Sequence, residues 1–483
     1  MTDLPQGWLR TSLGEIGKWS SGGTPSRRNA AFFGKGIPWV KSGDLTDGPI
    51  KQTEEELTEL GLNKSAAKLM PPGTISIALY GATIGKLGIL TFQAATNQAC
   101  ANVVPDTRLI DPRYLFFYLM SERETFVDKG QGGAQPNISQ QIVKAHDLLL
   151  APLNEQRRIV MKLDELLNRV NSAQERLATI PHLLKRFRQS VLAAACSGAL
   201  TTDWRVERRV TEPATTFLKR FDEQRKRQII ADNKKPNYLN YSLADCENVE
   251  SLPSTWIRVP VGFLCDCIVP GRDKPRSFTG SIPWITLPDI TSQEIRHSST
   301  GLMLTELEIQ EVNARIIPEN AVVMSCVGRF GIAAIVKKPV VVNQQLHGFL
   351  QSDAILPEYL LYSIKAATQY MQGLATSTTI AYLNKNNCNS LPINLPPVVE
   401  QQEIVRSVEA LFKTADALEA RYVKAKAHVD KLTRSILAKA FRGELVPQNP
   451  NDEPASILLE RVGQQRNGTG ATTGRSTTKR SLR

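Results

Sequence analysis

The sequence has few of the residues that build metal centres and disulfide-stapled folds. Five histidines are spread over 483 residues without forming a ligand cluster. The seven cysteines are odd in number and show none of the paired Cys-x-x-Cys spacings that zinc sites use. We therefore expect no metal site and no disulfide framework, and we interpret the cysteines as reduced thiols of a cytoplasmic protein.

Long apolar runs and secretion signals are also missing. Residues 1–10 are polar, and no uninterrupted apolar run reaches the roughly 18 residues that a membrane span requires. With 41% hydrophobic and 22% charged residues, the composition is that of an ordinary globular protein. We expect about three domains, a cytoplasmic location and no membrane partner.

Complete catalytic motifs are absent as well. The segment Gly81-x-x-x-Gly85-Lys86 is one residue too short for a phosphate-binding P-loop and lacks its Ser or Thr. The segment 394–398 resembles an amino-methyltransferase motif, but a leucine interrupts it and no aromatic residue follows to stack on a flipped base. We expect the chain to catalyse nothing and to bind no cofactor.

The net charge of +12 points to an anionic partner, but it is unevenly distributed. Residues 461–483 contain six Lys or Arg and no acid, and residues 204–235 contain ten against five acids. Residues 1–150 are nearly neutral, with 15 Lys or Arg against 14 Asp or Glu. The charge alone therefore does not identify the surface that meets the partner.

The most informative feature present is an internal repeat. Ile37-Pro38-Trp39 returns 245 residues later as Ile282-Pro283-Trp284, and residues 190–200 return as 435–445. From residue 152 to residue 200 the offset stays at 245, whereas between residues 4 and 150 it drifts between 245 and 248. Each half is therefore a variable globular unit followed by a unit of fixed length, and the period is too long for a solenoid repeat.

Each unit of fixed length has a heptad pattern of apolar residues, which predicts a long helix. From Asn154 to Ser197 is 44 residues, or about 66 Å at 1.5 Å per residue. We favour an antiparallel pair within the chain over a homodimer zipper, because each helix leads from one globular unit towards the other. Pro181 predicts a kink in the first helix only. The predicted seam residues are Ile159, Leu163, Leu166, Val170, Leu177, Leu184, Phe187, Ile404, Val408, Leu411, Leu418, Val429, Leu432 and Ile436.

The variable units contain signals of both strands and helices. β-prone runs occupy 74–79, 321–326 and 340–342, whereas 112–121 and 357–366 read as amphipathic helices opened by proline. The predicted fold is α+β: two globular mixed α/β domains separated by a pair of long antiparallel coiled-coil helices, with an internal pseudo-two-fold repeat.

Several loops combine glycine, hydroxyl groups and cations, which suit contacts to nucleic-acid phosphates and base edges. Ordinary solvated turns use the same residue types, so this interpretation has an equally simple alternative. Asn97-Gln98 and Asn343-Gln344 could address adenine, but we favour a structural role because they persist while their surroundings diverge. The candidate contact residues are Thr24, Ser26, Arg27, Arg28, Lys41, Ser42, Tyr80, Lys86, Arg272, Lys274, Arg276 and Arg329.

Several motifs together carry a family resemblance. Leu-Pro-x-x-Trp opens each half at residues 4–8 and 252–256, and Glu-Gln opens each long helix at 155–156 and 400–401. With the helix ends at 184–192 and 435–445 and with Gly22-Gly23-Thr24-Pro25, the chain resembles the specificity subunit of type I restriction-modification enzymes over about residues 4–447.

The resemblance implies that each variable unit is a target-recognition domain for one half of a bipartite, asymmetric site in double-stranded DNA. The helices would set the half-site spacing and dock two methylation subunits, with restriction subunits joining the complex. S-adenosylmethionine, ATP and Mg²⁺ would serve those partner subunits and not this chain. Two alternatives remain, a stand-alone DNA-binding regulator and a coiled-coil scaffold that binds only proteins.

The expected domain boundaries follow from the same features. They are target-recognition domain 1 at 1–150, a central helix at 151–203, a basic linker at 204–250, target-recognition domain 2 at 251–396, a C-terminal helix at 397–447 and a basic, disordered tail at 448–483.

Overall fold

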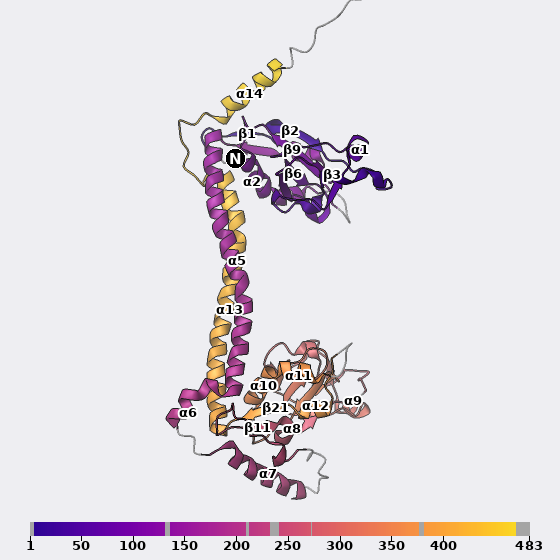
Figure 1. Cartoon of the computed structure of the whole chain (residues 1–483), viewed down its shortest axis with the longest axis vertical. Coiled ribbons are helices and arrows are strands. Elements are labelled where there is room, and N and C mark those ends of the chain that lie inside the picture. The colour runs from indigo at the N-terminus through magenta and orange to yellow at the C-terminus, as the bar shows by residue number, and fades with distance from the viewer. Residues whose placement is uncertain are drawn as a thin grey trace, which may run out of the picture. The chain divides into compact units, whose positions relative to one another are not determined.

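A computed structural model describes residues 4–130, 136–208, 212–231, 241–271, 273–375 and 381–469 (Figure 1). The chain divides into two compact units. Unit 1 contains Met1–Ala178 and Lys424–Arg483, and unit 2 contains Thr179–Val423. Each unit holds one globular domain and one end of each long helix; we call the globular parts domain 1 (residues 4–151) and domain 2 (residues 241–396).

The two long helices are α5 (Leu153–Ser197) and α13 (Val398–Phe441). In unit 1, residues 168–177 of α5 line the same groove as Ala425 and Val429 of α13. In unit 2, Arg188 of α5 forms ion pairs with Asp416 and Glu419 of α13. Within each unit the helices are therefore antiparallel, which confirms the predicted pair.

Each long helix is joined to its domain by a buried glutamine in its first turn. The Gln156 side-chain amide donates to the carbonyls of Leu109 (3.1 Å) and Ala151 (2.8 Å), and its oxygen accepts the Asp111 N–H (2.8 Å). Gln401 repeats these contacts with Ala354, Pro396 and Leu356. Both glutamines are fully buried, and each satisfies three backbone groups, two of them through buried hydrogen bonds.

A glycine follows the end of each long helix, at equivalent positions of the repeat. Gly198 (φ +82°) and Gly443 (φ +75°) adopt the left-handed conformation that follows a helix C-terminus. A side chain at either position would also strike the proline of a Leu-Pro-x-x-Trp motif, since a Cβ would lie 2.6 Å from Pro253 Cγ or 2.4 Å from Pro5 Cγ. The motif that opens each half therefore packs against the end of a long helix.

The predicted seam is closed only near the domains. Ile159, Leu163, Ile404 and Val408 are fully buried, whereas Leu418 remains 48% exposed. Phe187 is 39% exposed, so the helix pair leaves these last two seam residues partly open to solvent. Of the remaining seam residues, Val170 and Leu184 are buried and the others are partly exposed, namely Leu166, Leu177, Leu411, Val429, Leu432 and Ile436.

Pro181 lies inside α5, which continues through it as a helix. The kink there stays a prediction.

Domain 1 contains two small sheets and a short strand pair. The five-stranded sheet has the order β2-β9-β6-β7-β4, and the three-stranded sheet has the order β5-β3-β8. Helix α2 (Pro112–Ser121) confirms a predicted helix, and β6 confirms the strand predicted at 74–79. The strand bounds are β1 Leu9–Ser12 (paired with β10 Asp147–Leu150), β2 Gly17–Ser21, β3 Phe33–Val40, β4 Gly48–Ile50, β5 Glu55–Leu57, β6 Ile75–Ala78, β7 Leu87–Leu90, β8 Ala95–Thr96 and β9 Cys100–Pro105.

Domain 2 repeats this plan with sheets β12-β20-β17-β18-β14 and β15-β13-β19-β16. Helix α10 (Pro357–Ala366) and strands β17 and β19 confirm the elements predicted in this half. The strand bounds are β11 Ile257–Pro260 (paired with β21 Pro392–Leu395), β12 Cys267–Ile268, β13 Ile282–Ile285, β14 Glu294–Ile295, β15 Met303–Leu304, β16 Ile316–Ile317, β17 Val322–Ser325, β18 Ala333–Val336, β19 Val340–Val342 and β20 Leu346–Phe349.

The repeat extends past the long helices. After α5 and the short helix α6 (Thr202–Arg208), α7 (Ala214–Ala231) packs on domain 2, and after α13, α14 (Ala455–Thr469) packs on domain 1. Both helices follow a Glu-Pro-Ala sequence, and the N–H of their first alanine donates to a domain carbonyl: Ala214 to Thr255 (3.0 Å) and Ala455 to Gly7 (2.9 Å).

The expectation of a disordered tail is therefore wrong for residues 455–469, and the expected linker is largely helical where it is described. The physical reason is an apolar stripe inside a polar sequence. Leu458 and Val462 are buried against domain 1 together with Ala455. Residues 470–483 lie outside the described residues.

None of the helices in the described ranges is long and apolar enough to cross a membrane. The same residues contain no group of three or more His, Cys, Asp or Glu side chains placed to hold a metal ion.

The docking of α14 predicts that Leu458→Ala destabilises unit 1 by about 2–4 kcal/mol, because the leucine is 3% exposed and the substitution leaves a cavity. Chemical denaturation followed by tryptophan fluorescence measures this. Ile457→Ala, one residue away and 53% exposed, is the matched control and should change the free energy of unfolding by less than about 0.5 kcal/mol. Equal effects of the two variants would contradict the docking of α14.

The buried His347 predicts a loss of stability in mild acid. Burial, aided by nearby Lys385, lowers the pKa of His347 to about 4, below the usual 6.5. Between these two pKa values His347 is protonated in the unfolded chain but stays neutral in the folded chain. The free energy of unfolding therefore decreases as the pH falls through this window. The loss is about 2 kcal/mol at pH 5. His347→Leu should remove this component of the unfolding free energy, and His297→Leu, at an exposed histidine, should not.

Candidate nucleic-acid interface

The predicted contact loops of domain 1 leave the five-stranded sheet at one end of its strands. In the strand register Ala78 pairs with Cys100, Ser21 with Ala101 and Ile77 with Leu87. The loop after β2, the turn between β6 and β7, and the loop before β4 therefore emerge side by side. We call residues 22–28, 41–47, 79–86 and 97–99 the loop edge of domain 1.

Backbone hydrogen bonds hold these loops together. The N–H of Gly22 donates to the Cys100 carbonyl (3.1 Å), and the N–H of Asn97 donates to the Val40 carbonyl (2.9 Å). A Cβ at Gly22 would lie 1.9 Å from the Asn97 carbonyl oxygen, so the close approach requires glycine. The glycines of this segment are thus needed to build the edge, whether or not they approach a ligand.

Domain 2 has an equivalent loop edge, formed by residues 269–271, 273–276, 326–332 and 343–345. The Gln344 side-chain amide donates to the Gly271 carbonyl (3.0 Å), and the Cys326 N–H donates to the Gln345 carbonyl (2.9 Å). Asn343 donates its N–H to Ile285 (3.0 Å), as Asn97 does to Val40 in domain 1. These contacts support the structural role favoured for the two Asn-Gln pairs.

The structure brings the described candidate residues together at these two edges. In domain 1 the loop side chains are exposed except for Lys41 and Ser42, which are partly buried. Arg272 lies outside the described residues. The exposed candidates are Thr24, Ser26, Arg27, Arg28, Tyr80 and Lys86 in domain 1, and Lys274, Arg276 and Arg329 in domain 2.

Two of the candidate cations in domain 1 are already paired with carboxylates. Arg27 binds Glu55 through both guanidinium nitrogens (2.6 and 3.1 Å), and its Cζ lies 4.6 Å from the Phe33 ring centroid. Lys41 Nζ lies 2.9 Å from Glu54 and 3.0 Å from Glu55. Hydrogen bonds from Arg27 and then Lys41 lower the pKa of Glu55 to about 2, so the cluster stays charged at neutral pH.

One aromatic residue at the edge of domain 2 was not among the candidates. Tyr382 forms a β-bridge with Val327, and the equivalent bridge in domain 1 joins Asn137 to Tyr80. Both tyrosines are 43% exposed. Each domain therefore exposes one tyrosine at the same bridge, from opposite sides of it. The repeat offset of 245 relates Tyr382 to Asn137 and not to Tyr80, so the sequence carried no signal for this residue.

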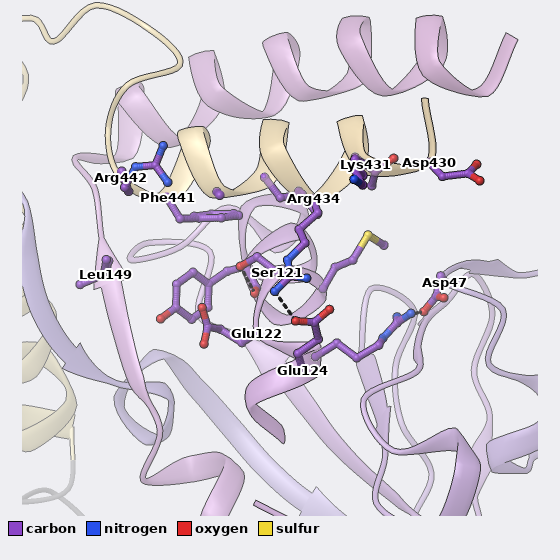
Figure 2. A pocket seen from close by; sticks show the side chains of 16 residues that line it. Asp47, Ser121, Glu122, Glu124, Leu149, Asp430, Lys431, Arg434, Phe441 and Arg442 are labelled. Carbon is purple, nitrogen blue, oxygen red and sulfur yellow. Dashed lines mark hydrogen bonds and ion pairs between the residues drawn. The ribbon is translucent and has the colours of Figure 1, made fainter. Parts of the chain in front are cut away.

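A chain of ion pairs connects α13 to the loop edge of domain 1. A cavity of about 770 Å³ lies beside α13, with Phe441 and Leu149 among the residues of its wall (Figure 2). Arg434 of α13 pairs with Glu124 of α3 (Arg123–Asp128), and the adjacent Arg123 pairs with Asp47 of the loop edge. Arg123 Nε also donates to the Gly85 carbonyl (3.0 Å), so α3 fastens two of the loops.

The described part of the basic segment 204–235 lies elsewhere on domain 2. Arg225 of α7 donates to the Phe263 carbonyl (2.5 Å) and to Asp266 (2.5 Å), just before β12 begins. The loop edge begins where β12 ends. Arg225 is therefore occupied by groups of domain 2 at the other end of β12 from the loop edge.

The two incomplete catalytic motifs have structural roles. The P-loop-like segment 81–86 is the turn between β6 and β7 and leads into a strand rather than a helix. Asn394 donates to the Cys196 carbonyl (2.9 Å) and accepts from Arg258 (3.0 Å), which fixes β21 against α5.

Comparison with known proteins gives one consistent family. The model of the type I restriction modification DNA specificity domain matches residues 5–182 and 266–426. The EcoKI specificity subunit of Escherichia coli K12 is 26% identical, over 97% of each chain. The EcoBI specificity subunit of E. coli is 31% identical, over 67% of this chain and 65% of that one. The StySPI specificity subunit of Salmonella potsdam is 27% identical, over 96% of each chain.

Two solved structures share the fold. A chain from a structural study of complex assembly and conformational transition in a type I R-M system has a TM-score of 0.66, with 18% identity over 92% of this chain and all of that one. The HsdS subunit from Thermoanaerobacter tengcongensis has a TM-score of 0.55, with 18% identity over 92% of this chain and 98% of that one.

Proposed function

The chain belongs to the family of type I restriction-modification DNA specificity subunits, and we propose that each loop edge reads one half of its DNA site. The resemblance seen in the sequence is confirmed, and neither the stand-alone regulator nor the protein-only scaffold is favoured. The observation that carries the proposal is the convergence of the candidate cations, hydroxyl groups and tyrosines on one edge of each domain. Exposed Arg and Lys suit phosphate oxygens and guanine, and an exposed tyrosine ring suits a thymine methyl or a base face.

The two half-sites should differ in sequence. Lys41 and Thr286 occupy equivalent positions, each followed three residues later by the aspartate that caps its turn. Tyr80 is likewise replaced by Val327 at the shared bridge. Because sequence is read by side chains at base edges, domains with the same frame and different edge residues read different bases. This supports an asymmetric, bipartite site.

Partner subunits would dock on the long helices, whose fixed length would set the half-site spacing. In unit 2, the ion pairs of Arg188 bring the turn of α5 that carries Phe187 next to the turn of α13 that carries Leu418. Both residues are large, apolar and exposed, as are Leu183 and Val423 nearby in sequence. Exposed apolar side chains of this kind support docking of two methylation subunits, with restriction subunits joining them.

We further propose that this chain is not catalytic. S-adenosylmethionine, ATP and Mg²⁺ would then be used by the methylation and restriction subunits. The support is that both segments resembling catalytic motifs serve the fold of their own domains.

Replacing one exposed cation at a loop edge tests the DNA contact. Arg329→Gln, in a complex with the methylation subunits, should weaken DNA binding and lower the slope of log K against log salt concentration by about 0.9, because one phosphate contact is lost. Lys219→Gln on α7 removes the same charge away from the loop edge and should leave the slope unchanged. An equal change of the salt slope in both variants would argue against a DNA contact at the loop edge of domain 2.

Replacing an exposed apolar residue of the helix pair tests the docking of the methylation subunits. Leu418→Gln should reduce co-purification of these subunits at least tenfold while the free chain stays folded, since the leucine is 48% exposed. Val206→Gln, at a 76% exposed residue of α6, is the control and should co-purify normally. Normal co-purification of the Leu418 variant would argue against docking at this turn.

A further inference from the structure

The two domains share an aromatic pair beside their loop edges but differ in what lies next to it. Phe33 and Trp39 pack edge to face at 5.9 Å, and Phe278 and Trp284 repeat the arrangement at 6.2 Å. The residue paired with Trp39 on the neighbouring strand β5 is Glu55. In domain 2 the backbone N–H of Trp284 donates to the carbonyl of Leu302. The residue opposite the tryptophan on the neighbouring strand is thus a glutamate in domain 1 and a leucine in domain 2.

Glu55 occupies the donors that DNA would need. Its two oxygens take both terminal nitrogens of Arg27, and one of them also accepts from Lys41. Arg27 is further fixed between Glu55 and the rings of Phe33 and Trp39, with its Cζ 4.6 and 5.1 Å from the ring centroids. An arginine uses the same pair of N–H groups for a phosphate or for the O6 and N7 of guanine. Glu55 and DNA therefore compete for one set of donors.

The loop edge of domain 2 has no such competitor. Lys274, Arg276 and Arg329 are exposed, and none of them has a carboxylate partner within the described parts of the chain. Cations of this kind bind phosphates of any sequence, because releasing counterions from DNA is favourable wherever the backbone passes. The two loop edges therefore differ in the charge that they offer to DNA. The described cations at the loop edge of domain 2 have no carboxylate partner, whereas Arg27 and Lys41 of domain 1 are neutralised by carboxylates.

We propose that Glu55 is a specificity-determining residue that keeps Arg27 and Lys41 occupied until a matching half-site replaces its carboxylate. The inference rests on the proposed function, in which the loop edge of domain 1 contacts DNA. Random DNA offers phosphates everywhere but does not place base acceptors opposite Arg27 and Lys41, and exchanging a carboxylate for a phosphate alone gains little. A displaced Glu55 also stays close to the DNA backbone and repels it. A matching half-site offers base acceptors as well, and the pair is exposed enough to be displaced, since the Glu55 side chain is 29% and that of Arg27 56% exposed.

The test is Glu55→Gln in the full complex with the methylation subunits. Binding is measured over a range of salt concentrations on two duplexes of equal length, one with the recognition site found from the methylation pattern and one without it. Without the carboxylate, affinity for the site-free duplex should rise about tenfold at low salt, and its salt slope should steepen by about one to two, because up to two cations are released for phosphates. Affinity for the specific duplex should change less, so the specificity ratio falls.

Two further variants keep the result interpretable. Glu15→Gln removes one negative charge from an exposed residue just before β2, at the opposite end of that strand from the loop edge. It should change the affinity for neither duplex. Glu54→Gln removes only a partner of Lys41; its side chain is 76% exposed, so the fold is not at risk, and it should give a smaller effect in the same direction. The proposal would be overturned if the Glu55 and Glu54 variants bound the site-free duplex with the same affinity as the Glu15 variant.

A separate arm distinguishes failure of this inference from failure of the proposed function. Arg27→Gln should weaken binding to the specific duplex. If it does and Glu55→Gln leaves site-free binding unchanged, only the role of Glu55 is refuted. If Arg27→Gln leaves specific binding unchanged, the contact between the loop edge of domain 1 and DNA is refuted as well.

Discussion

The junction between each domain and its long helix depends on one buried amide. Gln156 and Gln401 are fully buried, and each makes hydrogen bonds to three backbone groups, two of them through buried bonds. A buried polar group of this kind is satisfied in one geometry and is costly in any other, so it fixes direction more strictly than apolar packing does. The helix therefore leaves the domain along a single path, and the loop edge keeps a defined place relative to that helix within each unit.

Much of the fold could be predicted because its signals are local. The heptad spacing and the constant offset located the starts of α5 and α13 to within two residues, although the expected segments 151–203 and 397–447 extend six residues past the observed helix ends. Continuous apolar runs located β6, β17 and β19. Helix α14 could not be found in this way, because its likeness to α7 is confined to a few residues and its composition is polar. The exposure of Phe187 and Leu418 was equally hidden, since a heptad pattern states which residues face a partner helix and not whether a third element covers them.

The candidate interface was predictable in composition and not in electrostatics. Glycine, hydroxyl and cationic residues marked the loops, and the sheet register then gathered them at one edge. Nothing in the local sequence states that Glu55 lies beside Arg27, because they are 28 residues apart and meet only through the pairing of β3 with β5. Tyr382 was missed for a related reason: its equivalent is an asparagine, and only the bridge to Val327 shows that it belongs to the edge.

The discontinuity of unit 1 has a consequence for the order of events during synthesis. Unit 2 is continuous in sequence, whereas the core of unit 1 combines residues near the N-terminus with Leu437, Phe441, Leu458 and Val462. A ribosome releases the N-terminal segments first. Domain 1, although translated first, gains its last core side chains only after the whole of unit 2 has emerged, so the first half of the message encodes the half of the protein that is completed last.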